Sequence, residues 1–398
     1  MLDGRSYVCI YYLCAHVTLP DVLYDRSGML TRSCIAIRDG ILNAVNDSQY
    51  MAVRLAVSSR LCLIWGPPGT GKTTVVVHIL VQYLRRFPKA KILMTASMHN
   101  ATESSKVNKN LQKFAVDSRL GGSITDNPRL EARIVFTTCA GAGLGVLWNI
   151  DFDMVLIDKA SQITEPCCER AILVGDHVQL RPTVKPMGKA LEFDKSLFER
   201  LWKGNEYPGM IRTMLEVQYR FSAAVAHFPS QEFYEGHLQT GTPREAEIAA
   251  TLGISSFPWP RDPENSHISP VVFVPCTSEE DYGRSSKSNA GQVALVKHIV
   301  SLLRTPIGPH GDNAHRARLQ ALTIAVLTPY SRQVQLLRQT IPGGMDVVGD
   351  IVVFSTVRYE RRLNVAWTRP KLRLVIVGDR RTLGATSPLW KRALAACT

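Results

Sequence analysis

The stretch GPPGTGKT, Gly66 to Thr73, constrains this chain of 398 residues more than any other feature. It matches the pattern GxxxxGK[ST] in full, follows the apolar run Leu61–Trp65 and leads into a helical pattern over Thr73–Arg86. In a loop of this kind, backbone N–H groups surround phosphate oxygens, and the N-terminus of the following helix adds its dipole. The stretch therefore predicts a phosphate-binding loop between a strand and a helix of an α/β fold.

Two further positions extend this prediction to a nucleotide and a metal ion. In the loop pattern, Lys72 reaches the β- and γ-phosphates and the Thr73 hydroxyl is a ligand of Mg²⁺. Asp158 ends the apolar run Met154–Ile157, where doubly wound sheets place ligand groups, and its expected role is to hold Mg²⁺ through water. ATP and Mg²⁺ are thus the predicted cofactors. An enzyme that hydrolyses Mg-nucleotide is expected to carry a second acid directly after this aspartate, but Lys159 stands there.

Short apolar runs alternate with helical patterns along the chain, which is typical of βαβ units and parallel sheets. We expect an N-terminal segment over residues 1–40, a first domain over 41–207 and a second over 208–398, with the junction near Asn205–Gly209. Residues 239–269 are rich in Pro, Gly, Ser and charge and predict a surface excursion. The predicted strands are Leu61–Trp65, Ile92–Thr95, Ile134–Thr137, Met154–Ile157, Ala171–Val174, Val271–Val274, Ile324–Leu327, Ile351–Ser355 and Leu374–Val377.

The net charge, the cysteine content and the lengths of the apolar runs limit the kinds of partner and cellular compartment that fit this chain. The net charge is +13, and Val357–Thr398 alone carries ten Lys/Arg against two acids. Such a balance favours a polyanion, although a basic surface without a partner remains the alternative. Nine cysteines without a CxxC pair indicate a reducing compartment and argue against a zinc module. No apolar run reaches the roughly 18 residues of a membrane span, and the apolar start SYVCIYYLCAHV favours a buried strand over a secretion signal.

An ordered set of segments resembles the superfamily 1 helicases, most closely the Upf-like branch that includes the regulator of nonsense transcripts. The set runs from about Ile41 to Asp379 and comprises NDSQ, GPPGTGKT, TTCAGAG, VLIDKASQITEP, LVGDHVQLRP, VQYRFSAAVAHFPSQEFYEGHL, LTPYSRQV, IVVFSTVR and RRLNVAWTR. The resemblance implies an α/β protein with two RecA-like domains of the P-loop NTPase type, each a mostly parallel sheet flanked by helices. It also implies ATP between the domains and single-stranded nucleic acid across them.

The resemblance further implies roles for individual residues. Gln49 reads the adenine edge, Tyr219 stacks on the base, Gln179 couples the phosphate to movement of the strand, and Arg220 and Arg369 are arginine fingers. A γ-phosphate that develops charge in the transition state needs such cations. The catalytic set is thus Lys72, Asp158, Gln179, Arg220 and Arg369, and the metal ligands are Thr73 and Asp158. The ATP-binding set is Gln49, Gly66, Pro67, Pro68, Gly69, Thr70, Gly71, Lys72, Thr73, Thr74 and Tyr219.

By the same resemblance, nucleic acid is contacted from several strand ends. Hydroxyls and amides there suit contacts with phosphates, which carry no sequence information. Sequence-tolerant tracking of this kind is what a translocating motor requires. The residues concerned are Ser97, Asn100, Thr137, Thr138, Thr328, Pro329 and Tyr330.

Some positions depart from the family pattern. Besides Lys159, only twelve residues (159–170) separate Asp158 from the next strand, about the minimum for a parallel crossover. The loop expected before IVVFSTVR is reduced to Val348-Gly349-Asp350. The favoured function is an ATP-dependent RNA or DNA helicase core, acting in the cytoplasm or nucleus with mRNA-decay or other RNA-processing factors and without a membrane. The alternatives are a hydrolysis-deficient, ATP-gated nucleic-acid clamp and, less favoured, a small-molecule kinase.

Overall fold

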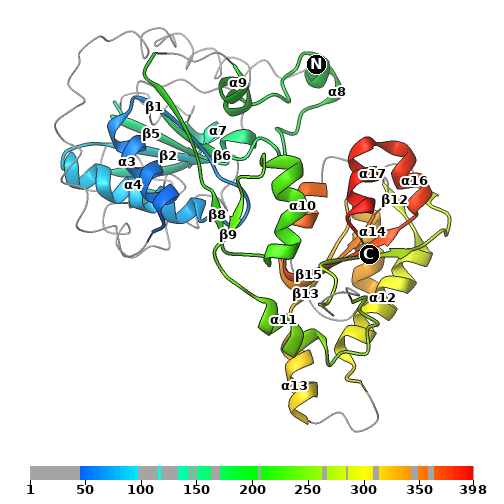
Figure 1. The fold of residues 1–398 in the computed structure, drawn as a ribbon. Helices are drawn as coiled ribbons and strands as arrows, with labels where there is room; N and C mark the ends of the chain where they lie inside the picture. Colours follow the sequence, from blue (N-terminus) through cyan, green and yellow to red (C-terminus); the bar gives the residue numbers. More distant parts are fainter. Residues whose placement is uncertain are drawn as a thin grey trace. The chain divides into compact units, whose positions relative to one another are not determined.

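The computed structural model describes residues 45–96, 115–117, 133–142, 147, 150–162, 171–204, 208–261, 267–283, 286–307, 313–341, 348–356 and 363–397. The chain divides into two compact units, with the boundary between Val217 and Gln218. Figure 1 shows the helices and strands of both units. No helix among the described residues is both long and apolar enough to cross a membrane.

The first unit is built on a seven-stranded sheet in the order β3-β4-β2-β5-β6-β1-β7, and every pair in it is parallel. Each of the five strands predicted for this part of the chain is present. Four strands (β1, β2, β5 and β6) are buried along their whole length, as strands with near-continuous apolar sequences in parallel sheets are. The strands are β1 (Leu61–Trp65), β2 (Ile92–Ala96), β3 (Ala115–Asp117), β4 (Ile134–Thr138), β5 (Met154–Asp158), β6 (Ala171–Gly175) and β7 (Met210–Met214).

Two helices supply much of the core of the first unit. Helix α3 (Asp47–Ser58) begins at a capping box in which Asn46 and Gln49 exchange hydrogen bonds between side chain and backbone. Helix α4 (Lys72–Arg86) buries Val76, Ile79 and Leu80 against the sheet, and it ends where Phe87 precedes a proline. Shorter helices are α7 (Cys139–Ala142), the 3₁₀ helix η4 (Ala160–Gln162), α8 (Pro186–Ala190) and α9 (Leu197–Lys203).

The second unit contains a four-stranded parallel sheet in the order β10-β15-β14-β13. Its strands are β10 (Val271–Pro275), β13 (Ile324–Leu327), β14 (Gly349–Ser355) and β15 (Pro370–Gly378), which include all four strands predicted here. Two small ribbons join β8 (Val217–Gln218) to β9 (Gln239–Thr240) and β11 (Asp281–Tyr282) to β12 (Lys287–Ser288). The helices are α10 (Ala223–Phe233), α11 (Glu245–Leu252), α12 (Ala290–Arg304), α13 (Asn313–Ala321), α14 (Ser331–Thr340), α15 (Leu363–Trp367), α16 (Arg380–Thr386) and α17 (Pro388–Ala395).

The expectation that residues 239–269 form a surface excursion is wrong for much of the segment. Helix α11 and the turn after it bury Leu252, Phe257 and Trp259 in the same apolar cluster as Val296 of α12 and Val353 of β14. The Trp259 indole N–H reaches a partner in the Ser255 hydroxyl at 3.1 Å, as a buried tryptophan requires. The apolar residues are interspersed among Pro, Gly and charged residues, which concealed them in the composition.

Candidate nucleotide-binding site

The predicted site of the first unit lies along the edge of the sheet where the parallel strands end. The pairing register places Trp65 opposite Gly175, Val174 opposite Asp158, and Ala96 opposite both Asp158 and Thr138. The phosphate-binding loop, Asp158 and the segment after β6 therefore emerge from neighbouring positions of one edge. The strand β6 lies between β1 and β5 and separates the loop from Asp158 by one strand.

The phosphate-binding loop folds as its glycines require. Gly69 and Gly71 have φ values of 77° and 76°, in the left-handed region that side chains disfavour. Helix α4 begins at Lys72 without a side-chain cap, so its first N–H groups remain available to an anion. The Lys72 ammonium donates to the carbonyl oxygens of Pro67, at 3.0 Å, and Gly66. In this structure the Lys72 side chain thus folds back onto the first two residues of the phosphate-binding loop.

Gln49 joins helix α3 to the phosphate-binding loop. Its Oε1 accepts the Asn46 N–H at 3.1 Å, and its Nε2 donates to the Thr70 carbonyl at 2.9 Å. The side chain is buried, and a Cβ at Gly71 would collide with its amide. Both ends of the amide are engaged within the protein, and each keeps one further hydrogen-bonding position, a lone pair on Oε1 and an N–H on Nε2.

Asp158 lies at the end of β5 and is buried. Burial raises the pKa of its carboxyl, while the Lys159 N–H at 2.8 Å and the positive charges of Lys72 and Lys159 oppose that rise. Lys159 itself is exposed and has a φ of 55°, which turns the chain sharply after the aspartate.

Gln179 belongs to a polar cluster that the sequence analysis did not anticipate. Its amide donates to the Asp176 carboxylate, which also accepts the Trp65 indole N–H at 3.0 Å and the Val178 N–H at 3.3 Å. Asp176 is buried, and its own N–H donates to Ser161 of η4 at 3.4 Å. Asp176 therefore links the ends of β1 and β6, and its only sequence signal was an Asp directly after an apolar run.

The second unit brings its two predicted arginine fingers together. Arg220 donates to the Thr368 carbonyl at 3.4 Å, directly beside Arg369 in the chain. Burial lowers the pKa of Arg220 and the charge of Arg369 lowers it further; burial also lowers the pKa of Arg369. Neither guanidinium forms an ion pair with a carboxylate among the described residues. Two crowded cations without a counter-charge favour the arrival of an anion. Tyr219 is 41% exposed beside them.

The predicted nucleic-acid contacts fall on both units. Thr137 and Thr138 end β4, where Thr137 is buried and Thr138 half-buried. Residues 328–330 connect β13 to α14, and the buried Thr328 hydroxyl has no hydrogen-bond partner among the described residues. Ser97 and Asn100 lie outside the described residues.

Comparisons with known proteins agree with this arrangement. Two family models, each described as an AAA domain, match residues 193–381 and residues 44–107 with 99–187. Among curated proteins, the chain is 29% identical to a regulator of nonsense transcripts 1 homolog of Drosophila melanogaster over 88% of this chain and 35% of that protein. It is 28% identical to the DNA polymerase alpha-associated DNA helicase A of Schizosaccharomyces pombe over 85% of this chain and 64% of that protein.

It is also 30% identical to the ATP-dependent helicase NAM7 of Saccharomyces cerevisiae over 88% of this chain and 43% of that protein. Among solved structures, a complex of the arterivirus nonstructural protein 10 helicase with DNA matches 85% of this chain and 64% of that one. The sequence identity is 15% and the TM-score is 0.40. The chain spans between 35% and 64% of the length of the curated relatives named here. The phosphate-binding loop on a parallel sheet, with a second α/β unit after it, confirms the expected RecA-like fold. The chain therefore belongs to the superfamily 1 helicases, in their Upf-like branch.

Proposed function

We propose that this chain is the ATP-hydrolysing core of a helicase. It binds ATP and single-stranded RNA or DNA, and it couples hydrolysis to translocation and unwinding. The observation that carries the proposal is the shared edge of the first sheet, where an intact phosphate-binding loop and a buried strand-end carboxylate come together. The printed names of the relatives, which include an ATP-dependent helicase, support the same activity.

The residues at this edge fit Mg²⁺. A hydroxyl and a carboxylate are the hard oxygen ligands that this ion accepts, and the exposed Thr73 and the buried Asp158 offer them. Burial raises the pKa of the Asp158 carboxyl and so disfavours its charged form. A bound cation would act in the opposite direction and favour the carboxylate. When bound with ATP, Mg²⁺ supplies neutralisation of phosphate charge.

The remaining roles are those that the resemblance to the superfamily 1 helicases implies. Lys72 leaves its loop carbonyls for the β- and γ-phosphates, and Gln179 helps to position the attacking water. Arg220 and Arg369 stabilise charge on the γ-phosphate, where an arginine finger is worth ~10³–10⁵ in rate. Gln49 and Tyr219 hold the adenine.

The partners follow from the same proposal. The strand-end residues Ser97, Asn100, Thr137, Thr138, Thr328, Pro329 and Tyr330 contact the nucleic-acid backbone. The relatives named as regulators of nonsense transcripts suggest mRNA-decay factors as further partners, in the cytoplasm or the nucleus.

The proposal is tested by thermal unfolding with and without MgATP. A ligand that binds only the folded state at about 100 times its Kd stabilises that state by about 2.7 kcal/mol, so Tm should rise clearly. The Lys72→Ala protein should lose most of this rise, because the cation for the β- and γ-phosphates is gone. Lys89→Ala, at an exposed turn after α4, serves as the control and should retain it. An equal rise in the Lys72→Ala protein would place the nucleotide elsewhere.

A further inference from the structure

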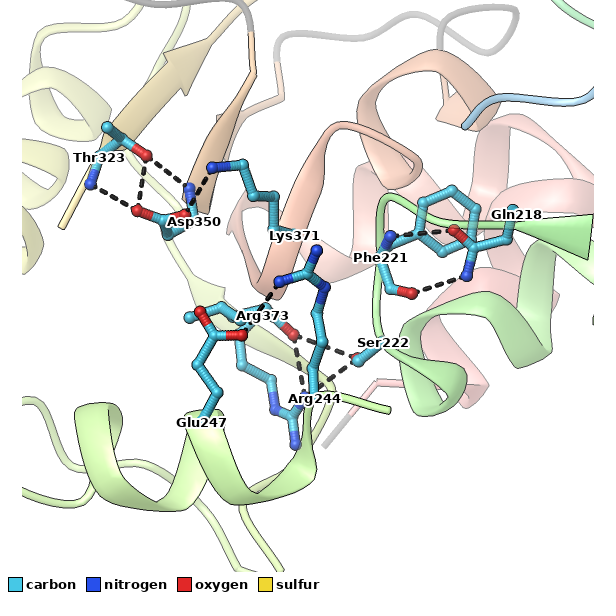
Figure 2. Close-up of polar contacts among 10 residues, drawn as sticks. Gln218, Phe221, Ser222, Arg244, Glu247, Thr323, Asp350, Lys371 and Arg373 are labelled. Carbon is cyan, nitrogen blue, oxygen red and sulfur yellow. Dashed lines mark hydrogen bonds and ion pairs between the residues drawn. The ribbon is translucent and has the colours of Figure 1, made fainter. Parts of the chain in front are cut away.

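The segment Gln218–Ser222, which we call the finger loop, carries Tyr219 and Arg220 between β8 and α10. Its shape depends on the side chain of its first residue. The Gln218 Oε1 accepts the backbone N–H of Arg220 at 2.8 Å and that of Phe221 at 2.9 Å, and its Nε2 donates to the Phe221 carbonyl at 2.6 Å. Figure 2 shows the paired bonds between Gln218 and Phe221.

The Gln218 amide has a fourth bond, which anchors it outside the loop. Its Nε2 also donates to the Thr240 hydroxyl at 2.9 Å, on the partner strand β9. The side chain is 0% exposed, so water cannot replace a hydrogen bond that is lost there. Replacing the amide by an apolar group would leave the N–H groups of Arg220 and Phe221 and the Phe221 carbonyl without this partner. The amide therefore acts as a fixed template around which the backbone of Arg220 and Phe221 is folded.

The far end of the finger loop is held to strand β15, which follows Arg369 directly. The Ser222 N–H donates to the Lys371 carbonyl at 3.0 Å, and the Ser222 hydroxyl contacts both the Leu372 carbonyl at 3.3 Å and the Arg373 guanidinium at 3.2 Å. Arg373 is 3% exposed, and Figure 2 shows it beside Ser222. The finger loop is thus fastened at both ends, which leaves few ways for the Arg220 backbone to move.

The two attachments of the finger loop matter because Arg220 is repelled by the positive charge of Arg369. Its guanidinium donates to the carbonyl of Thr368, the residue before Arg369, and forms no ion pair with a described carboxylate; the charge of Arg369 lowers the pKa of Arg220. Repulsion between the two cations favours any movement of Arg220 away from Arg369 while no anion is bound. A loop that could yield would let Arg220 swing away, whereas a loop held by a buried amide keeps it in place.

We propose that Gln218 is a positioning residue that holds the finger loop so that Arg220 meets the γ-phosphate of ATP. The inference rests on the proposed function, because it needs Arg220 to act on bound nucleotide. The effect is specific to the triphosphate, since ADP lacks the group that Arg220 contacts.

The test compares the affinity for ATPγS with the affinity for ADP, each measured by titration with Mg²⁺ and independent of turnover. Gln218→Met keeps the length of the side chain but removes all four bonds. It should lower the ratio of ATPγS to ADP affinity by about tenfold or more, the size of one lost hydrogen bond to a charged group. Gln218→Asn, one methylene shorter, should lower the ratio in the same direction and decides the question if the Met variant does not fold.

Two variants control for a loss of stability. Gln333→Met removes an equally buried glutamine of the same unit, which bonds to the Asn289 N–H at 2.8 Å and the Ser355 hydroxyl at 3.1 Å. Thr240→Val removes only the bond that leads outside the finger loop. Both should lower Tm. Gln333→Met should leave the affinity ratio within about twofold of wild type, and Thr240→Val, which keeps the three bonds within the finger loop, should lower it less than Gln218→Met does.

A double-mutant cycle with Arg220→Ala separates positioning from a general structural effect. If Gln218 acts through Arg220, then Gln218→Met should change the ratio no further once Arg220 is alanine. Wild-type protein that discriminates between ATPγS and ADP, together with Gln218 variants that discriminate equally well, would overturn the inference and leave the proposed function intact. Wild-type protein that binds neither nucleotide would overturn both.

Discussion

At the scale of single residues, Lys159 stands where a second acid is expected after Asp158. Its backbone N–H is committed to the Asp158 carboxylate, while its side chain is exposed. An ammonium group has no free electron pair with which to take a proton from the attacking water, whereas a carboxylate does. We therefore expect this position to present a cation to ATP instead of a base.

We expect Lys159→Glu to raise the rate of strand-stimulated phosphate release by about 10²-fold or more, because a positioned general base is worth ~10²–10⁴ in rate. Phosphate release in the presence of single-stranded RNA and DNA is the measurement. Lys159→Gln removes the positive charge without adding a base, so it should show little of the gain.

Equal and brisk rates in wild type and Lys159→Glu would mean that another group is the base. If neither protein hydrolyses ATP while both bind it, the chain would act as an ATP-gated clamp instead of a motor.

At the scale of elements, the amino ends of β13, β14 and β15 are joined by one carboxylate. Asp350 accepts the Thr323 N–H at 2.8 Å and its hydroxyl at 2.7 Å, and it pairs with Lys371 at 2.9 Å (Figure 2). The register between β14 and β15 shifts between Gly349 and Ile351. Asp350 thus supports an irregular strand end at the start of β14.

Asp350 makes the stability of the second unit dependent on pH. Burial alone would raise the pKa of this carboxyl, but its bonds with Thr323 and Lys371 outweigh burial and the pKa is lowered. A lowered pKa means that the charged form stabilises the fold above the unfolded pKa of about 4, and that this contribution disappears as the pH falls through the folded value.

Asp350→Asn should therefore lower the free energy of unfolding by about 1–2 kcal/mol at pH 7, and the difference from wild type should shrink below about pH 4. Denaturant unfolding across this range measures it. The control is Asp281→Asn, which breaks the exposed pair with Arg332 and should have little effect at any pH. A constant difference for Asp350→Asn from pH 7 to pH 3 would contradict the assignment.

At the scale of the whole molecule, the net charge of +13 is not all available to a partner. Near the C-terminus, Lys371 pairs with Asp350 and Arg392 pairs with Glu232. Arg373 is buried among carbonyl oxygens. Some of the basic side chains of this segment therefore stabilise the fold of the second unit, and only the others are available to bind a polyanion.

We still expect single-strand binding to weaken steeply with salt, because cations that contact phosphates release counterions. With about four to six phosphates contacted, log K should fall against log salt with a slope of roughly −3 to −4. Fluorescence anisotropy of a labelled single strand between about 50 and 200 mM salt measures the slope. An affinity that stays constant over this range of salt would exclude binding of the single strand through a groove of positive charge.

The sequence by itself determined where nine strands of the two parallel sheets lie, although not β3 or β7, and it predicted where phosphate would bind. Strands of a parallel sheet are buried on both faces, so each appears as an apolar run that needs no knowledge of its neighbours. The phosphate-binding loop is equally local, because its glycines, lysine and threonine act within eight consecutive residues, Gly66 to Thr73. The family segments also predicted Arg220 and Arg369 as arginine fingers, and that role stays a prediction.

Only the tertiary structure decided which polar groups hold these segments in place. Trp65 and Asp176 are 111 positions apart, and Arg373 and Ser222 are 151 apart. Gln218 stands in a motif, but its bond with Thr240 depends on how the chain returns after α10. A buried hydrogen bond leaves no periodic mark in a sequence, because either partner could equally face water. Its existence follows from the fold, which brings donor and acceptor together where water is excluded.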